Sequence, residues 1–222
     1  RALQRMCEKK TNLPILTVDT NGMELYDVGE EKAWLTLFKT FAGKDVASQK
    51  EASEEDDSSK KMKIGVLGLT PHDVSDLKIE EKFRKSENEN THYICYGMRA
   101  GIDKVKTAGS ADKNLVVAPA ALETAKYLEK TFGTPYEIHY PLVDELIPDV
   151  DYTGKEVLIV HQQVIANSIR KELLKKGAKR VQIASWFMMK KELLADGDVL
   201  LRDEDAYIEL VQNGDFDIIF AD

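Results

Sequence analysis

The sequence has few cysteines, no long apolar run and no excess of positive charge, and each absence excludes a class of protein. Only 2 of its 222 residues are cysteine, and Cys7 and Cys95 are too far apart for a disulfide framework or a metal-ligand motif. No apolar run approaches the roughly 20 residues that span a bilayer, and no signal-peptide pattern opens the chain. The net charge of −8, with acidic and basic residues interspersed, argues against nucleic acid or an anionic membrane as a partner. We therefore expect a cytoplasmic protein that binds neither.

Several motifs that carry well-known chemistry are also missing. Gly65 and Gly68 in GVLG are not followed by a third glycine that opens a helix, which excludes the dinucleotide-binding fingerprint. The sequence contains no phosphate-binding P-loop and no serine, histidine and acid in the order of a known catalytic triad. We interpret Cys95, in HYICY, as a small apolar residue of the core.

The sequence does contain short apolar runs that alternate with amphipathic helices. Residues 114–136 are the clearest example, because the strand residues LVV precede a helix that Pro119 opens and Gly133 closes. This alternation is typical of parallel sheets with helices on both faces. With 43% hydrophobic residues, the chain can form one large or two small domains. We predict an α/β protein with two Rossmann-like, doubly wound and mainly parallel sheets, the second of them truncated.

Changes of composition divide the chain into four segments. The apolar run PILTV, at 14–18, predicts a strand, and the aperiodic residues 141–154 mark the boundary between two sheets. We expect the second sheet to stop after three strands. Because the chain begins without methionine and ends directly after FDIIF, we also expect a fragment of a longer polypeptide. The segments are the end of a preceding α/β domain with a connecting helix (1–42), a polar mobile loop (43–61), a central α/β domain (62–147) and the start of a further α/β domain (148–222).

Candidate functional residues follow the carboxyl ends of the predicted strands, where open α/β sheets bind their ligands. His72 and His161 are the candidate catalytic residues, because imidazole gives and takes protons near neutral pH. We expect these two histidines to face one cleft from opposite domains. The candidate ligand-contacting residues are Tyr26, Asp27, Glu30, Glu31, Thr70 and Gln162.

Each candidate also has a purely structural interpretation. Thr70 or Asp73 can cap a helix in TPHD, and a histidine at the end of a strand, such as His161, is commonly hydrogen-bonded without a catalytic task. Carboxylates at the start of a helix, such as Asp27 and Glu30, complement its dipole. The residues alone therefore leave both interpretations open and indicate a ligand-binding α/β protein.

The order of several segments resembles the nitrogenase component 1-type oxidoreductases over nearly the whole chain. The most specific of them is NLVVAPAALETAKYLEKTFGTPY, which is similar to a strand, helix and Phe-Gly-Ile-Pro turn of that family. The others are LPILTVDTNGMELYDVGEEKAW, KIGVLGLTPHD, YTGKEVLIVHQQVIANSIRKELLKKGAKRV and NGDFDIIFAD.

The resemblance implies a subunit with three α/β domains that pairs with a homologous partner subunit. In such complexes an ATP-dependent iron–sulfur reductase supplies electrons through an iron–sulfur cluster, and the domains enclose a metal cluster or a tetrapyrrole. By resemblance, the loops at 26–31, 69–73 and 161–163 line this cavity. The resemblance places the cysteines for the cluster outside this chain, so we expect no cofactor bound to the fragment itself.

Two departures from the family pattern bear on its activity. The segment ELYDVGEE offers tyrosine and carboxylates where catalytic nitrogenase subunits have a glutamine and a histidine, and residues 141–155 hold no cysteine for a cofactor. Reduction of dinitrogen is therefore not expected. The leading hypothesis is a nitrogenase-like reductase subunit for low-potential electron transfer to a buried substrate or metallocofactor. A non-catalytic scaffold or partner subunit, and a small-molecule binding module without a redox role, are the alternatives.

Overall fold

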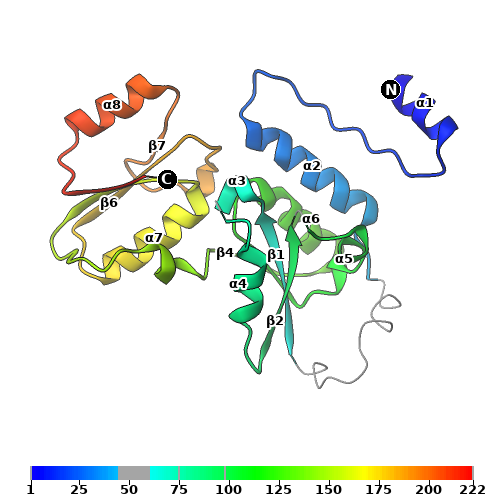
Figure 1. Ribbon diagram of the computed structural model, residues 1–222, viewed down its shortest axis with the longest axis horizontal. Coiled ribbons are helices and arrows are strands. Elements are labelled where there is room, and N and C mark those ends of the chain that lie inside the picture. Colours follow the sequence, from blue (N-terminus) through cyan, green and yellow to red (C-terminus); the bar gives the residue numbers. More distant parts are fainter. Residues whose placement is uncertain (1, 45–60, 75, 98, 222) are drawn as a thin grey trace.

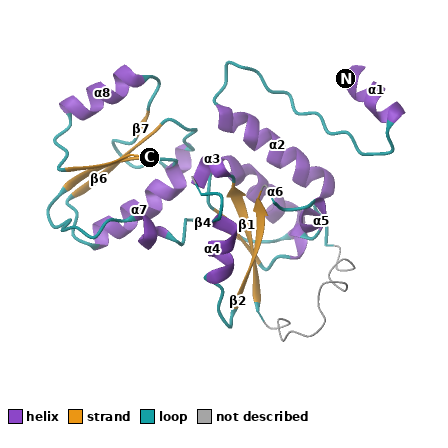
Figure 2. Cartoon of the chain, in the orientation of Figure 1, coloured by secondary structure: helices purple, strands orange, loops and turns teal. Residues whose placement is uncertain are grey.

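The structure is a computed structural model that describes residues 2–44, 61–74, 76–97 and 99–221 (Figure 1). The loop predicted at 43–61 falls almost entirely outside these residues. The described chain folds into two four-stranded sheets with helices around them, as Figure 2 shows by element type. Every pairing between the strands of these sheets is parallel.

The first sheet has the strand order β2-β1-β3-β4. Its strands are β1 (Met62–Leu69), β2 (Thr91–Gly97), β3 (Lys113–Val116) and β4 (Tyr136–Ile138). Alternate side chains face opposite sides of the sheet. Val66 and Leu115 belong to one apolar cluster with Phe83 of α4 (Ile79–Lys85). Leu67 and Val116 belong to another, with residues of α2 (Tyr26–Phe41), α5 (Ile102–Lys106) and α6 (Leu122–Phe132).

The second sheet has the strand order β7-β6-β5-β8. Its strands are β5 (Glu156–Val160), β6 (Arg180–Ser185), β7 (Val199–Leu200) and β8 (Ile218–Ala221). Helix α7 (Gln163–Lys175) packs on one face and α8 (Glu204–Asn213) on the other. The expectation of three strands is wrong, because β7 makes a fourth. Two residues are too few to show a periodic pattern in the sequence.

Both sheets are doubly wound, which confirms the predicted fold class. In the first sheet the chain goes from β1 outward to β2 and then returns to the other side of β1, where β3 and β4 follow. In the second sheet β6 and β7 lie on one side of β5 and β8 lies on the other. Such reversals of direction leave a crevice at the carboxyl ends of the strands.

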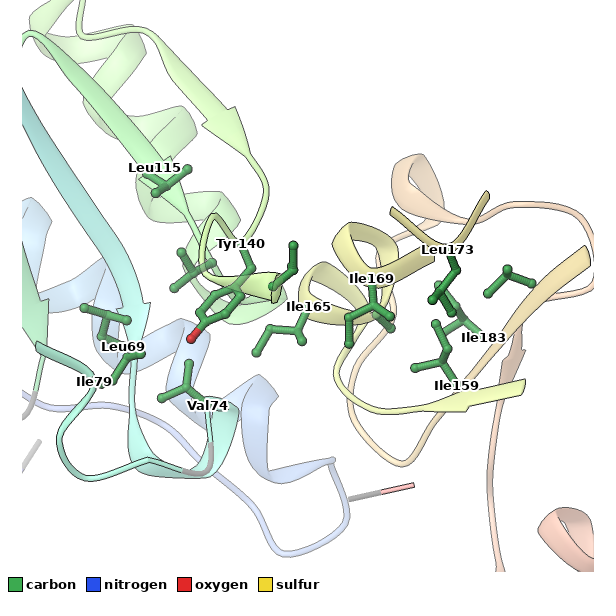
Figure 3. Close-up of a cluster of buried hydrophobic side chains, with 14 of the residues drawn as sticks. Leu69, Val74, Ile79, Leu115, Tyr140, Ile159, Ile165, Ile169, Leu173 and Ile183 are labelled. Carbon is green, nitrogen blue, oxygen red and sulfur yellow. The ribbon is translucent and has the colours of Figure 1, made fainter. Parts of the chain in front are cut away.

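A single apolar cluster continues from one sheet into the other. Figure 3 shows it running from Leu69 through Tyr140 and Ile165 to Ile183 of the second sheet. Tyr140 is 5% exposed and its backbone N–H donates to the buried Ser168 hydroxyl of α7. The sheets therefore pack together through α7 and the segment after β4.

The N-terminal part differs from the prediction. Residues 14–18 form no strand in the structure, because no neighbouring strand of the described chain pairs with them. They belong instead to an extended segment, residues 11–25, which we call the arm. The arm connects α1 (Ala2–Lys10), which has no buried residue, to α2 (Figure 1). Helix α2, predicted as part of a connection, packs on α6 and the first sheet.

The remaining elements are short. They are α3 (Pro71–Val74), η3 (Ala108–Ser110), η4 (Pro119–Ala121), η5 (Val143–Leu146) and η6 (Lys191–Leu193). Within the described ranges, no helix has both the length and the apolar character that crossing a membrane requires.

Candidate functional site

The carboxyl ends of β3 and β5 are joined by one buried side chain, Gln162. Its Nε2 donates to the carbonyl oxygen of Val117 at 2.7 Å, and its Oε1 accepts the N–H of Val164 at 2.7 Å. Gln162 is therefore both the N-cap of α7 and the link between the sheets, and it is 0% exposed. This link holds the carboxyl edges of the two sheets against each other.

The start of α2 is bonded to the loop that follows β6. Asp27 accepts the backbone N–H of Met188 through Oδ2, and Glu31 forms an ion pair with Lys190. The bonded residues are far apart in the sequence. They meet because α2 begins beside the junction of the two sheets (Figure 1). Asn21 turns the arm into this helix by accepting the N–H groups of Met23 and Glu24.

A cavity of about 1070 Å³ lies between the arm, α2, α3 and the end of β2. This volume is at the upper limit for a small-molecule site. Apolar side chains of the arm and of α2 form most of its wall, and Glu30, Thr70 and His72 form its polar end. The full lining consists of Leu16, Val18, Thr20, Asn21, Glu24, Leu25, Tyr26, Gly29, Glu30, Ala33, Trp34, Leu37, Thr70, His72 and Gly97.

His72 lies between two aromatic rings at the polar end of the cavity. The ring centroids of His72 and Tyr26 are 4.7 Å apart, and those of His72 and Phe187 are 4.8 Å apart. Both contacts are edge-to-face. His72 belongs to α3, which follows β1 of the first sheet, and Phe187 belongs to the loop after β6 of the second sheet. This contact therefore joins the two sheets.

Two further carboxyl groups, those of Asp27 and Asp73, lie close to Glu30 at this polar end. Asp27 and Asp73 are each 2% exposed, and Glu30 is half-buried. Burial, followed by the charge of Glu30, raises the pKa of Asp73 to about 8, although a hydrogen bond from Thr70 opposes the shift. Burial also raises the pKa of Asp27, against the opposing effects of the Met188 N–H and the charge of His72. Burial therefore favours the protonated form of Asp73.

This arrangement can donate and accept protons. Asp73 and Glu30 lie close enough together that the charge of Glu30 is one of the causes that raise the pKa of Asp73. Glu30 Oε1 accepts the indole N–H of Trp34 at 3.0 Å, whereas Oε2 is buried without another hydrogen-bond partner among the described residues. A carboxyl group whose pKa lies near the working pH, next to an imidazole, is suited to acid–base chemistry.

The structure brings together some of the residues selected from the sequence. Tyr26, Glu30, Thr70 and His72 line the cavity, and Asp27 and Glu31 lie beside it in the contact with the loop after β6. Thr70 also confirms the predicted cap, because its hydroxyl oxygen accepts the N–H of Asp73 at 3.4 Å.

His161 and Gln162 lie elsewhere on the carboxyl edge. Neither lines the cavity, and His161 Nδ1 accepts the N–H of Gln162 at 2.7 Å. Its assignment as a catalytic residue stays a prediction. Trp34, Phe187 and Lys190 were not predicted, and Asp73 was predicted only as a cap and as part of the loop at 69–73. Asp73 was visible in TPHD, but no sequence signal showed that α2 would place two carboxyl groups beside it.

Gln162→Ala is expected to lower the free energy of unfolding by about 2 kcal/mol. The substitution removes the cap of α7 and leaves the buried carbonyl of Val117 without its donor. Urea unfolding measures the effect. Gln212→Ala, at an exposed position of α8, is the control and should change stability by less than about 0.5 kcal/mol. Equal stability of the two variants would contradict the assigned link.

The described residues do not fit an iron–sulfur cluster. Such clusters are held by several cysteine thiolates. Cys95 is buried, and that burial raises the pKa of its thiol to about 12, while Cys7 belongs to α1. Within the described residues, no group of three or more histidine, cysteine or acidic side chains is placed to hold a metal ion.

The arrangement of sheets and helices has a counterpart among solved structures. A chain described as "Nitrogenase Cp1 at pH 6.5" superposes with a TM-score of 0.52 and 16% sequence identity, over 87% of this chain and 53% of that chain. The present chain thus spans about half the length of the solved one. No family model and no curated protein matches the sequence. At this identity the likeness concerns the fold alone, and the chain therefore shares the α/β fold of this nitrogenase chain.

Proposed function

We propose that this chain is part of an oxidoreductase subunit of the nitrogenase component 1 type, and that its cavity encloses the molecule to be reduced. The observation that carries the proposal is the position of Glu30 and His72, which line a large cavity with the protonated Asp73 behind them. Reduction of an organic molecule consumes protons as well as electrons. The fold likeness to a nitrogenase chain supports the same role.

In this proposal the chain's own residues bind the molecule and supply protons. The apolar side chains of the arm and α2 bind its body and exclude water. His72 donates a proton from its place between Tyr26 and Phe187, and Asp73 restores the proton through Glu30. An iron–sulfur cluster and an ATP-dependent reductase would supply the electrons. We place that cluster on a homologous partner subunit or outside this chain, since the described residues do not fit one.

A small-molecule binding module without a redox role is the second candidate function. The observation that favours it is the lack of a metal-binding group among the described residues, while the cavity is present. A non-catalytic scaffold subunit would match the missing cysteine in residues 141–155. Both alternatives are compatible with the observed fold. They differ from the main proposal because in neither of them does this chain take part in a reduction.

Anaerobic purification of the full-length polypeptide with its partner subunit tests the redox role. We expect iron and acid-labile sulfide in whole-number ratios to protein, with a visible charge-transfer absorption that reductant bleaches. His72→Phe should keep the iron content and slow the reoxidation of the reduced complex by its substrate. A colourless, iron-free complex would rule out the redox role and leave the binding module.

A further inference from the structure

The charges around the cavity indicate which ligand it binds. Among the described residues that line it, Glu24 and Glu30 are acidic, His72 carries an imidazole, and none is lysine or arginine. Lys32 neutralises Glu24 at an Nζ–Oε2 distance of 2.5 Å, and Lys190, near the polar end, is paired with Glu31. Among the described residues, no lysine or arginine is therefore paired with the carboxyl group of Glu30.

Two buried acids, Asp27 and Asp73, lie close to Glu30. Asp27 is 2% exposed, and its Oδ1 is buried without a hydrogen-bond partner among the described residues. Asp73 adds a second buried carboxyl group, which is also 2% exposed. Among the described residues, His72 is the only base that lines this end. An anionic ligand would find no lysine or arginine to pair with in the described part of the lining.

The walls of the cavity favour an apolar body next to a positive charge. Trp34 places its indole ring beside the carboxyl group of Glu30, to which its N–H is bonded, and Tyr26 also lines the cavity. A carboxylate next to aromatic rings binds an ammonium group through charge attraction and cation–π contact. Leu16, Val18 and Leu37 supply apolar surface along the rest of the cavity.

We propose that the cavity binds an apolar molecule that carries a protonated amine, with the ammonium group at Glu30 and the apolar body between the arm and α2. This inference rests on the part of the proposed function that makes the cavity a binding site, and it is independent of the redox role. A site for such a cationic ligand differs from a site that binds a phosphate, a carboxylate or an anionic metal cluster.

Three probes of similar size and different charge test the proposal: phenylbutylamine, phenylbutanol and phenylbutyric acid. Trp34 reports binding by its fluorescence in a Trp186→Phe background, since the chain has 2 tryptophans. Near neutral pH we expect the amine to bind about tenfold more tightly than the alcohol and the acid to bind most weakly. Glu30→Gln keeps an acceptor for the Trp34 indole and should weaken amine binding about tenfold, with little change for the alcohol.

Control variants and other outcomes separate this inference from the proposed function. Glu129→Gln, at an exposed position of α6, should leave the affinity for all three probes unchanged. If the acid binds as tightly as the amine, or if Glu30→Gln leaves amine binding unchanged, the assigned ligand class is wrong while the cavity stays a binding site. If none of the probes binds, the cavity is not a binding site and the enclosure in the proposed function is wrong as well.

Discussion

Gly68→Ala is expected to lower the free energy of unfolding by about 3 kcal/mol or more. The loss has two causes, backbone strain and a steric clash. Gly68 has a φ of +93°, a conformation that L side chains rarely adopt. A Cβ at this position would lie 2.8 Å from the Cβ of Ala118 and 2.9 Å from its backbone nitrogen. The backbone near Ala118 cannot move away easily, because Gln162 bonds to the adjacent Val117.

Gly133→Ala is the matched control for this substitution. Gly133 also has a positive φ, +78°, but a Cβ there would meet no atom within 4 Å. Only the backbone strain remains, so the expected loss is about 1 kcal/mol. Denaturant unfolding of both variants measures the difference. If both variants lost the same stability, the close contact between Gly68 of β1 and Ala118, which follows β3, would not add to the cost of the substitution.

Asp73→Asn is expected to remove a large dependence of stability on pH. The pKa of Asp73 is about 8 in the folded chain, against 3.8 for an aspartate exposed to water. Between these two pH values the folded state binds a proton that the unfolded state has released, so the stability of the protein falls as pH rises through this window. We expect a loss of at least about 2 kcal/mol between pH 5 and pH 9, because each unit of pKa shift corresponds to about 1.4 kcal/mol.

The asparagine variant should lack this loss. Near pH 5 its amide resembles the protonated carboxyl group of Asp73, so its stability should match that of the unchanged protein. Near pH 9 it should be the more stable of the two, by at least about 2 kcal/mol. Asp149→Asn, at an exposed position, should leave the pH dependence unchanged. A pH profile of Asp73→Asn parallel to that of the unchanged protein would mean that Asp73 is ionised in the fold.

The periodic segments were predictable from the sequence because their causes are local. The strand, helix and glycine stop at 114–136 became β3, η4, α6 and Gly133, which adopts the left-handed conformation. Their apolar spacing and their capping residues lie within a few turns of one another. The same holds for β5 and α7, where Gln162 precedes the helix that it caps. Here the local pattern and the tertiary fold agree.

The failures of prediction have tertiary causes. PILTV has the composition of a strand, but a strand requires a pairing partner, and the arm has none among the described residues. The pKa of Asp73 depends on Glu30 and Asp27, which belong to α2 and are brought to it by folding. Phe187 reaches His72 from the opposite sheet through a loop without periodicity. Contacts of this kind leave no signal in a single sequence.

The crystal structure of the protein with bound phenylbutylamine is the most direct test of the claim that the cavity is the ligand-binding site. The account predicts ligand density between the arm and α2, with the amine nitrogen within hydrogen-bonding distance of Glu30 and the phenyl ring against the apolar side chains of the arm. Density for the amine only at other surfaces, with the space between the arm and α2 empty or closed, would contradict it.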